Sequence, residues 1–126
     1  MDEGRNCPFC QVDEAAIRNA LAYVRFDKNP VNPGHCLIIP LRHISDFFEM
    51  TLDERQAMLS LADEAKAMLE LKFSPDGYNL GLNVGAVAGQ TVPHVHLHLI
   101  PRYAGDVDQP RGGVRGVIPS KQNYQP

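Results

Sequence analysis

Apolar residues recur with two different periods along this chain, and each period predicts its own kind of element. Over residues 58–69 they return every three or four positions, as they do on one face of a helix. Thr51 and Glu54 form a capping-box pattern before this stretch, and a Ser-Pro-Asp-Gly turn at 74–77 ends it. We therefore predict one long helix from about residue 51 to residue 72, with its apolar face packed on the core.

Four other segments have the composition of strands. Short apolar runs predict strands at 20–25, 35–40 and 78–84, and turns rich in Pro, Gly and Asn separate them. The fourth segment, 90–101, alternates histidine with valine or leucine, and such alternation is typical of a strand with one apolar face. The order strand, strand, helix, strand, strand indicates an α+β fold with an antiparallel sheet.

The composition is that of an ordinary globular domain. Hydrophobic residues make up 44% of the 126 residues and charged residues 21%, which fits one domain with a single core. We expect a tail at 1–6, a core at 7–102 and a C-terminal arm at 103–126. The arm is rich in Gly, Pro and Gln, which is typical either of a disordered tail or of an arm that wraps the body or a partner subunit.

Charge and hydropathy argue against several classes of function. The net charge of −3 disfavours a general nucleic-acid-binding surface. No apolar run approaches the roughly 20 residues of a membrane span. The N-terminus lacks the basic and apolar segments of a secretory signal. We therefore expect a cytoplasmic protein with neither a nucleic-acid partner nor a membrane partner.

Three of the five histidines occupy alternate positions, at His94, His96 and His98. On a strand this period places the three imidazoles on one face, with the outer two roughly 13 Å apart. Imidazoles are poor packing material and titrate near neutrality, so three in a row are hard to explain as structural residues. One metal ion can bind two neighbours of such a row but hardly all three, which predicts different roles for different histidines.

The segment 94–100 resembles the signature of the histidine-triad (HIT) family of nucleotide hydrolases and transferases, His-φ-His-φ-His-φ-φ with φ apolar. The flanking segments 89–92 and 101–102 are also similar to members of this family, and the resemblance extends from about Cys7 to Arg102. It implies a HIT-like antiparallel sheet with one long helix and a short helix, a C-terminal irregular arm, and a homodimer. Within the family, the resemblance is to the branch that contains diadenosine polyphosphate hydrolases and unclassified bacterial HIT proteins.

The resemblance also implies roles for the histidines. In HIT enzymes the middle histidine is the nucleophile, which makes His96 the residue expected to attack the α-phosphorus of a nucleotide and form a nucleotidyl-histidine. Water then releases the nucleoside monophosphate. His98 is expected to face the α-phosphate and the leaving group, and His35, in a Pro-Gly-His segment, to orient the triad.

Further residues match substrate-side positions of the family. Asn83, Gln90 and Thr91 correspond to polar positions around the scissile phosphate. Asp27 stands where the family often has a group for the ribose hydroxyls, although it is equally interpretable as a turn residue. Three residues are candidates for lining a base pocket: Tyr23, Phe26 and Leu37.

Two of the three cysteines form a Cys-x-x-Cys pair, Cys7 and Cys10. In a chain without an export signal, such a pair is more often a metal or redox site than a structural disulfide. Two thiolates are half of a tetrahedral zinc site, and two nitrogen ligands complete it. The residues alone leave four candidates for those nitrogens: His35, His43, His94 and His98.

The resemblance selects among these candidates. Some HIT branches, and the related galactose-1-phosphate uridylyltransferases, bind zinc with two cysteines, a histidine after the second strand and the first triad histidine. The matching set is Cys7, Cys10, His43 and His94, which implies a closed, structural zinc site that leaves His96 free to attack. The alternative is a reducible disulfide or a pair of vacant thiols.

Three functions compete. The first is nucleotide hydrolysis or transfer through His96, acting on a dinucleoside polyphosphate or a nucleoside phosphoramidate. The second is a zinc-dependent hydrolase in which a metal-bound hydroxide attacks, and this requires an open coordination position that two cysteines and two histidines close. The third is nucleotide binding without turnover, which does not require a nucleophile.

Overall fold

The computed structural model describes residues 6–125, so that only Asn6 of the predicted tail is included. In chain order the strands and the long helix are β1 (Ile17–Arg18), β2 (Ala22–Phe26), β3 (Cys36–Pro40), α2 (Leu52–Phe73), β4 (Gly77–Gly81) and β5 (Leu97–Arg102). Short 3-10 helices occupy the connections: η1 (Pro8–Cys10), η2 (Phe47–Glu49), η3 (Ala86–Ala88), η4 (Gly113–Val117) and η5 (Pro119–Lys121). Within the described part of the chain, no helix has the length and apolar character needed to cross a membrane.

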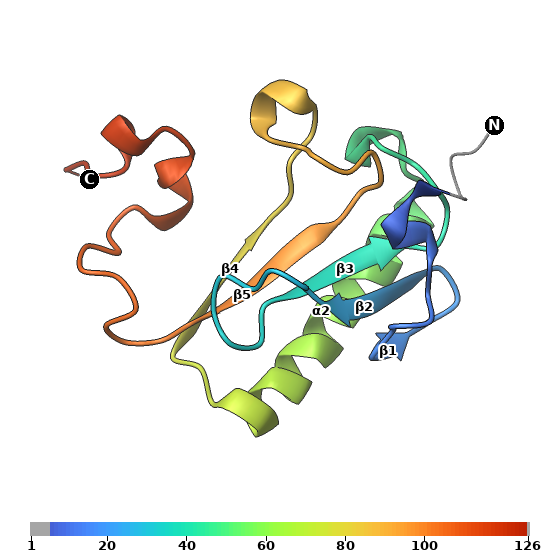
Figure 1. The fold of residues 1–126 in the computed structure, drawn as a ribbon, viewed down its shortest axis with the longest axis horizontal. Helices are drawn as coiled ribbons and strands as arrows, with labels where there is room; N and C mark the ends of the chain where they lie inside the picture. The colour runs from blue at the N-terminus through green and yellow to red at the C-terminus, as the bar shows by residue number, and fades with distance from the viewer. Residues whose placement is uncertain (1–5, 126) are drawn as a thin grey trace.

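The strands form one antiparallel sheet in the order β1-β2-β3-β5-β4. Helix α2 crosses one face of this sheet, and the C-terminal arm lies beyond the β4 edge (Figure 1). Each pair of neighbouring strands runs antiparallel, including β3 and β5, which are far apart in the sequence. The α+β fold with one antiparallel sheet and one long helix is therefore confirmed.

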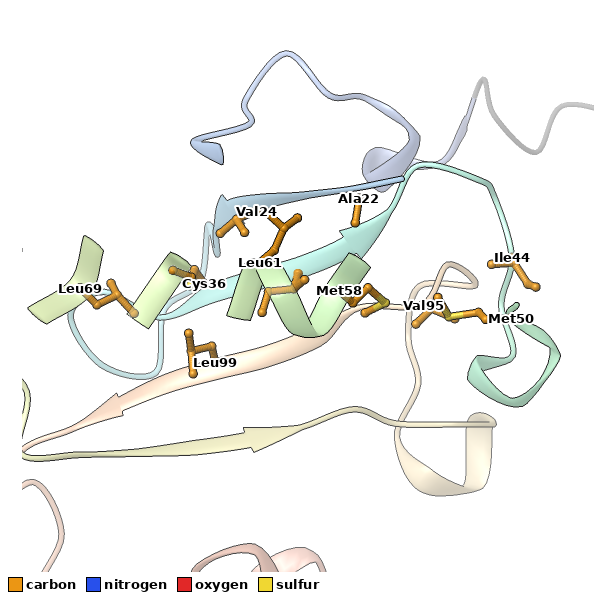
Figure 2. Close-up of a cluster of buried hydrophobic side chains, with 12 residues drawn as sticks. Ala22, Val24, Cys36, Ile44, Met50, Met58, Leu61, Leu69, Val95 and Leu99 are labelled. Carbon is orange, nitrogen blue, oxygen red and sulfur yellow. The ribbon is translucent and has the colours of Figure 1, made fainter. Parts of the chain in front are cut away.

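The apolar stripe of helix α2 forms the main core with the sheet. Met58, Leu61 and Leu69 are at most 2% exposed. They pack against β2 and β5 through side chains such as Val24 and Leu99 (Figure 2). Complete burial of one such side chain stabilises a fold by about 1.5–3 kcal/mol, so this stripe is what holds the helix on the sheet.

Alternation along the strands separates the two faces of the sheet. Val24 and Ile38 belong to the core under helix α2, whereas Tyr23 and Leu37 belong to a second buried cluster on the other face. His98 is directly opposite Leu37 in the β3–β5 register, so it lies on this second face. The histidine site is therefore built on the face of the sheet that helix α2 does not cover.

Helix α2 begins with the capping box that the sequence indicates. Thr51 Oγ1 accepts from the Glu54 N–H at 3.1 Å, and Glu54 Oε1 accepts from the Thr51 N–H at 2.9 Å. Ser74, at φ 49°, ends the helix in the left-handed conformation. The predicted bounds of 51–72 are therefore correct to within one residue at each end.

Glu54 also forms an ion pair that makes stability depend on acid pH. Arg42 donates to both carboxylate oxygens, at 2.9 and 2.7 Å, and these bonds lower the pKa of Glu54 to about 2. A lowered pKa means that the stabilisation is complete above the ordinary pKa of 4.5 and is lost as the pH falls through 2. Because Arg42 is half exposed, we expect Glu54→Gln to lower the free energy of unfolding by about 1–2 kcal/mol at neutral pH.

Urea unfolding of both proteins from neutral to strongly acidic pH measures this effect. The difference in unfolding free energy should be constant above pH 4.5 and shrink as the pH approaches 2. Glu70→Gln, which removes the exposed partner of Lys66 on the same helix, is the matched control and should show a much smaller difference. A Glu54→Gln difference that is independent of pH would contradict the ion-pair explanation.

The strand that carries the histidines starts later than the alternation predicts. β5 begins at Leu97, so His98 lies on it, while His94 and His96 lie in the irregular segment before it. Pro40, the last residue of β3, has no N–H to donate, and its carbonyl accepts from the His94 ring at 2.8 Å. The backbone pairing between β3 and β5 therefore stops before Pro40. The prediction of a strand from residue 90 is wrong for its first half.

The other predicted strands are present with shifted ends. β2 and β3 agree with 20–25 and 35–40 to within two residues, and β4 ends at Gly81 although the prediction continues to 84. β1 pairs with β2 but was not predicted, because two residues are too few to show a period.

The C-terminal arm is anchored at its root. Asp106 accepts from Arg102 at 2.7 and 2.8 Å and from the Asn32 side chain at 2.8 Å. Ala104 donates its N–H to Asp76 at 2.8 Å. Further out the arm contains η4 and η5 and lies beside the β4 edge (Figure 1).

Candidate active site and metal centre

The five imidazole rings and one phenyl ring form a continuous row. Three pairs of ring centroids are 5.1 to 5.2 Å apart: His43 with His94, His96 with His98, and His98 with His35. The Phe9 ring joins the two halves, with its centroid 6.3 Å from that of His94 and 4.8 Å from that of His96. Side chains that are up to 87 residues apart in the sequence thus meet in one site.

His96 is held in one tautomer. Its Nδ1 lies 2.8 Å from the carbonyl oxygen of His94, and because a carbonyl only accepts, the proton of the neutral ring lies on Nδ1. Nε2 then carries the lone pair. The residue is 7% exposed, so little water competes for that lone pair. A neutral imidazole with an unprotonated Nε2 is the form that can attack phosphorus.

A second chain of hydrogen bonds orients His98. The backbone N–H of Val31 donates to Nδ1 of His35 at 3.0 Å, which places the His35 proton on Nε2. His35 Nε2 lies 2.9 Å from Nδ1 of His98 and donates to it. The Nε2 of His98 therefore carries a proton, so that His98 is a donor where His96 is an acceptor.

Burial keeps the rings of this pair neutral near pH 7. The pKa of His35 is lowered by burial and is raised to a smaller extent by Asp27, whose Oδ2 lies 3.4 Å from His35 Nε2. The pKa of His98 is lowered first by burial and then by repulsion from His96 and His35. A negative phosphate placed against His98 raises its pKa again and favours a proton-donating imidazolium.

Four side-chain donors meet at the other end of the row. Nδ1 of His94 lies 3.3 Å from Sγ of Cys7 and 3.5 Å from Sγ of Cys10, and Nδ1 of His43 lies 3.2 Å from Sγ of Cys10. The four donor atoms all lie within 4.8 Å of one another, a spacing that can hold a metal ion. Two thiols and two imidazoles are a typical donor set for tetrahedral zinc.

His94 has the hydrogen bonding expected of a metal ligand. Its Nε2–H donates to the carbonyl of Pro40 at 2.8 Å, which leaves Nδ1 unprotonated and directed at the sulfurs. A ligand histidine that donates its other nitrogen to a backbone carbonyl is the usual arrangement in zinc sites. Because four protein ligands complete a tetrahedron, this set favours a structural ion.

The substrate-side candidates differ in their surroundings. Asn83 and His98 line the same cavity, of about 560 Å³, between β4 and the C-terminal arm. Thr91 is exposed. Oδ1 of Asp27 accepts from a backbone N–H two residues later at 2.8 Å, as in a turn, while Oδ2 faces His35.

The side chain of Gln90 is engaged by the loop around it. Its Oε1 accepts from the Gly85 N–H at 2.9 Å, and its Nε2 donates to the carbonyls of Ser45 at 2.9 Å and Val92 at 3.2 Å. Both amide hydrogens are therefore used within the protein. Gln90 holds the loop at 85–89 against the segment that leads into the histidines.

The three candidates for a base pocket do not lie together. Tyr23 and Leu37 are 0% and 3% exposed, in the cluster on the histidine face of the sheet. Phe26 lies on the opposite face, where its ring packs against that of Phe73 from helix α2. The expectation is therefore wrong for Phe26, because the period of two along β2 turns its side chain away from His98.

Two residues outside the predicted site complete the surroundings of the row. Phe9 lies between the two cysteines, and its ring meets that of His96 at an interplanar angle of 62°. Arg25 is only 3% exposed and donates to the carbonyl of Pro8 at 3.1 Å and to Glu14 at 3.2 Å. The position of Phe9 inside the Cys-x-x-Cys pair was the one available signal for it.

Known proteins resemble this chain in sequence. An uncharacterized HIT-like protein of Mycoplasma genitalium is 38% identical over 104 residues, which cover 78% of this chain and 74% of that protein. AP-4-A phosphorylase of Mycobacterium tuberculosis is 33% identical over 80% of this chain and 56% of its own length. The asymmetrical bis(5'-nucleosyl)-tetraphosphatase of Schizosaccharomyces pombe is 35% identical over 73% of this chain and 50% of its own length. This chain therefore matches only about half of each named enzyme.

Solved structures agree with the fold. A HIT family protein from Bacillus anthracis is 34% identical with a TM-score of 0.74, over 80% of this chain and 76% of that chain. A zinc-bound histidine triad family protein from Mycobacterium smegmatis is 27% identical with a TM-score of 0.73, over 82% of this chain and 79% of that chain. The HIT domain family matches residues 11–105, which include all five histidines. With this match, the row of histidines and the antiparallel sheet that carries it, the chain belongs to the HIT family.

Proposed function

We propose that this protein is a nucleotide hydrolase or nucleotidyl transferase that cleaves its substrate at the α-phosphate through a covalent nucleotidyl-histidine on His96. The proposal is carried by the hydrogen bond from His96 Nδ1–H to the His94 carbonyl, which leaves Nε2 as a fixed acceptor beside the His98 ring. A protein that only binds nucleotides does not require such an acceptor. The names of two relatives, which are enzymes of diadenosine or dinucleoside tetraphosphates, support a dinucleoside polyphosphate as substrate. A nucleoside phosphoramidate, cleaved at the same α-phosphate, is the alternative substrate.

In the first step the Nε2 lone pair of His96 forms a bond to the α-phosphorus. The bond from phosphorus to the leaving group breaks, and its electron pair goes to the leaving atom. His98, in the imidazolium form that the phosphate favours, gives its Nε2 proton to that atom. The ring centroids of His96 and His98 are 5.1 Å apart, which allows both imidazoles to act at the same phosphorus.

In the second step water attacks the same phosphorus from the side that the leaving group has vacated. Neutral His98 accepts the proton of the water at Nε2, and the bond between phosphorus and His96 breaks with its electron pair on Nε2. The nucleoside monophosphate is released and His96 regains its lone pair. Before the substrate binds, His35 holds the neutral His98 ring in place by donating to its Nδ1.

Four residues are proposed to contact or position the substrate: Asp27, Asn83, Gln90 and Thr91. The Oδ2 of Asp27 lies beside the His35–His98 pair, where a carboxylate can accept from the ribose hydroxyls. Asn83 shares the cavity with His98 and can donate to a phosphate or leaving-group oxygen. Thr91 offers an exposed hydroxyl, and Gln90 acts through the loop at 85–89 that it holds.

We also propose a structural zinc ion and a cytoplasmic homodimer. The donor set of Cys7, Cys10, His43 and His94 supports zinc, as does the zinc-bound relative from Mycobacterium smegmatis. β4 is an edge strand of the sheet, and its Leu80 is 46% exposed. A second copy of the chain that packs against this edge would cover both.

The metal-hydroxide mechanism receives less support. The four protein donors of the cysteine–histidine set leave no coordination position for a hydroxide. Asp27, His35 and His98 also lie close enough to hold a metal ion. However, the facing nitrogens of the two histidines lie 2.9 Å apart and are hydrogen-bonded to each other.

The proposal is tested by AMP release from diadenosine tetraphosphate and adenosine phosphoramidate, measured side by side. Samples quenched early in alkaline denaturant are digested and analysed by mass spectrometry, because phosphorus–nitrogen bonds are labile in acid. We expect turnover of at least one compound, one adenylyl group on the peptide that contains His96, and survival of turnover after brief chelation. Turnover that proceeds without this adduct would overturn the proposal, as would complete abolition of turnover by the chelator without unfolding. A partial loss of rate on chelation is compatible with it.

A further inference from the structure

We propose that Phe9 is a positioning residue for His96, and that the Cys7–Cys10 knuckle transmits the state of the metal-binding set to the nucleophile through the Phe9 ring. The knuckle is the segment from Cys7 to Cys10, which includes η1. This inference rests on the proposed function, because it concerns the orientation of the proposed nucleophile.

Two aromatic rings contact the His96 imidazole. The Phe9 centroid is 4.8 Å away at an interplanar angle of 62°, and the His98 centroid is 5.1 Å away at 66°. Edge-to-face contacts at these distances are attractive. The bond from His96 Nδ1 to a carbonyl decides the tautomer but still allows the ring to swing about that bond. The Phe9 ring restricts this swing and so sets the direction in which Nε2 points.

The position of Phe9 depends on the two cysteines that flank it. The Cys10 N–H donates to the Cys7 carbonyl at 3.2 Å, which closes the knuckle. Both sulfurs also lie within 3.5 Å of Nδ1 of His94. An ion that binds the two sulfurs and the two histidines therefore fixes both ends of the four-residue segment that carries the Phe9 ring.

Strand β2 holds the backbone of the knuckle from the other side. The Tyr23 hydroxyl donates to the Phe9 carbonyl at 2.6 Å, and Nη1 of Arg25 donates to the Pro8 carbonyl at 3.1 Å. The guanidinium carbon of Arg25 lies 5.6 Å from the centroid of the Phe9 ring. Tyr23 and Arg25 are 0% and 3% exposed, so the side chains that hold the knuckle are themselves buried and hydrogen-bonded. These two side chains restrain the main chain of the knuckle, and the donor set restrains its ends.

His94 connects the donor set to His96 by a second route. Its ring faces the sulfurs, while its carbonyl accepts the Nδ1 proton of His96. Any change in the donor set thus acts on both restraints of His96, which are the hydrogen bond to the His94 carbonyl and the contact with the Phe9 ring. Because misplacement of a reacting group by 1 Å can cost about 100-fold in rate, small shifts here have measurable consequences.

The test compares the zinc-loaded wild type with zinc-loaded Phe9→Ala. We expect the rate of adduct formation and kcat to fall by about 10- to 100-fold. The affinity for AMP and the zinc content should change by less than about 3-fold, because neither ligand set loses a donor. Phe9→Leu, which keeps apolar bulk without a ring, should give an intermediate rate.

Val12→Ala is the matched control. Val12 packs against the same buried cluster as Phe9, and no ring contact with a histidine involves it. We expect it to lower the melting temperature without lowering kcat. If Phe9→Ala keeps kcat within about 2-fold of the wild type, raises only KM, or loses kcat no more than Val12→Ala does, the positioning role is wrong. Absence of any turnover in the wild type would instead reject the proposed function itself.

The NMR signal of the proton bound to Cε1 of His96 provides a measurement that does not depend on activity. In zinc-loaded wild type it should be a single sharp line, and in Phe9→Ala it should broaden because the ring samples several orientations. The same broadening is expected in metal-free wild type, studied below its melting temperature.

Metal removal should also lower the adduct rate of Phe9→Ala much less than that of wild type. Equal, additive losses, or an unchanged resonance in both samples, would show that the metal does not act through Phe9.

Discussion

Replacement of His96 by alanine is expected to remove nearly all turnover and to leave nucleotide affinity largely intact. The variant lacks the unprotonated Nε2 of His96, which lies beside a proton donor on His98. Loss of a catalytic nucleophile typically lowers kcat by about 10⁴-fold or more. The residues proposed to contact the phosphate and the ribose are unchanged in this variant, so binding of AMP should change little. Steady-state AMP release, early-quench mass spectrometry and calorimetric AMP binding measure the three quantities.

Chemical rescue provides the control for this variant. His96→Gly leaves space beside the Phe9 and His98 rings that free imidazole can enter. Added imidazole should restore part of the turnover in His96→Gly and have no effect on the wild type. Near-normal turnover of His96→Ala would show that the nucleophile assignment is wrong.

Replacement of His43 by alanine is expected to lower zinc content and melting temperature together. His43 supplies one of the four donors, and its Nδ1 lies 3.2 Å from Sγ of Cys10. Because metal binding to such a set contributes directly to folding, we expect a loss of about 3 kcal/mol or more, which corresponds to a melting temperature lower by about 10 °C. Its ring touches His94 and not His96, so turnover should fall far less than in His96→Ala. Metal analysis by mass spectrometry and calorimetric melting provide the measurements.

Cys36→Ala is the matched control for the metal prediction. Cys36 is a fully buried cysteine in β3 that belongs to the main core, and burial raises the pKa of its thiol to about 12. Its replacement should leave zinc content unchanged, although the core loses some packing. Unchanged zinc content in His43→Ala would remove His43 from the donor set.

The strands and the helix show which element boundaries can be predicted from local sequence patterns. The capping box of Thr51 and Glu54 places the start of helix α2 correctly, because both of its hydrogen bonds join residues three positions apart. The alternation around the histidines, in contrast, does not reveal that β5 starts only at Leu97. That boundary depends on Pro40, which lies 54 residues from His94 in the sequence and ends the partner strand.

The candidate site shows the same division. The motif itself marks His94, His96 and His98, and the Cys-x-x-Cys pair marks a metal site, because both are short-range patterns of chemically distinctive residues. The residues alone did not decide which histidines join the cysteines. The structure places His43 and His94 beside the sulfurs and His35 at the opposite end of the row.

Local patterns in the sequence were thus enough to predict the α+β class, the long helix, the row of histidines and the thiol pair. Which ring nitrogen is a donor follows from the folded structure, because the tautomers depend on the His94 carbonyl and the Val31 N–H. The tertiary structure alone brought Phe9 against His96, across 87 residues of sequence, and turned Phe26 to the helix-covered face. The physical reason is that periodicity reports the face on which a side chain lies, whereas hydrogen-bond direction and ring contacts depend on groups that folding brings together from distant parts of the chain.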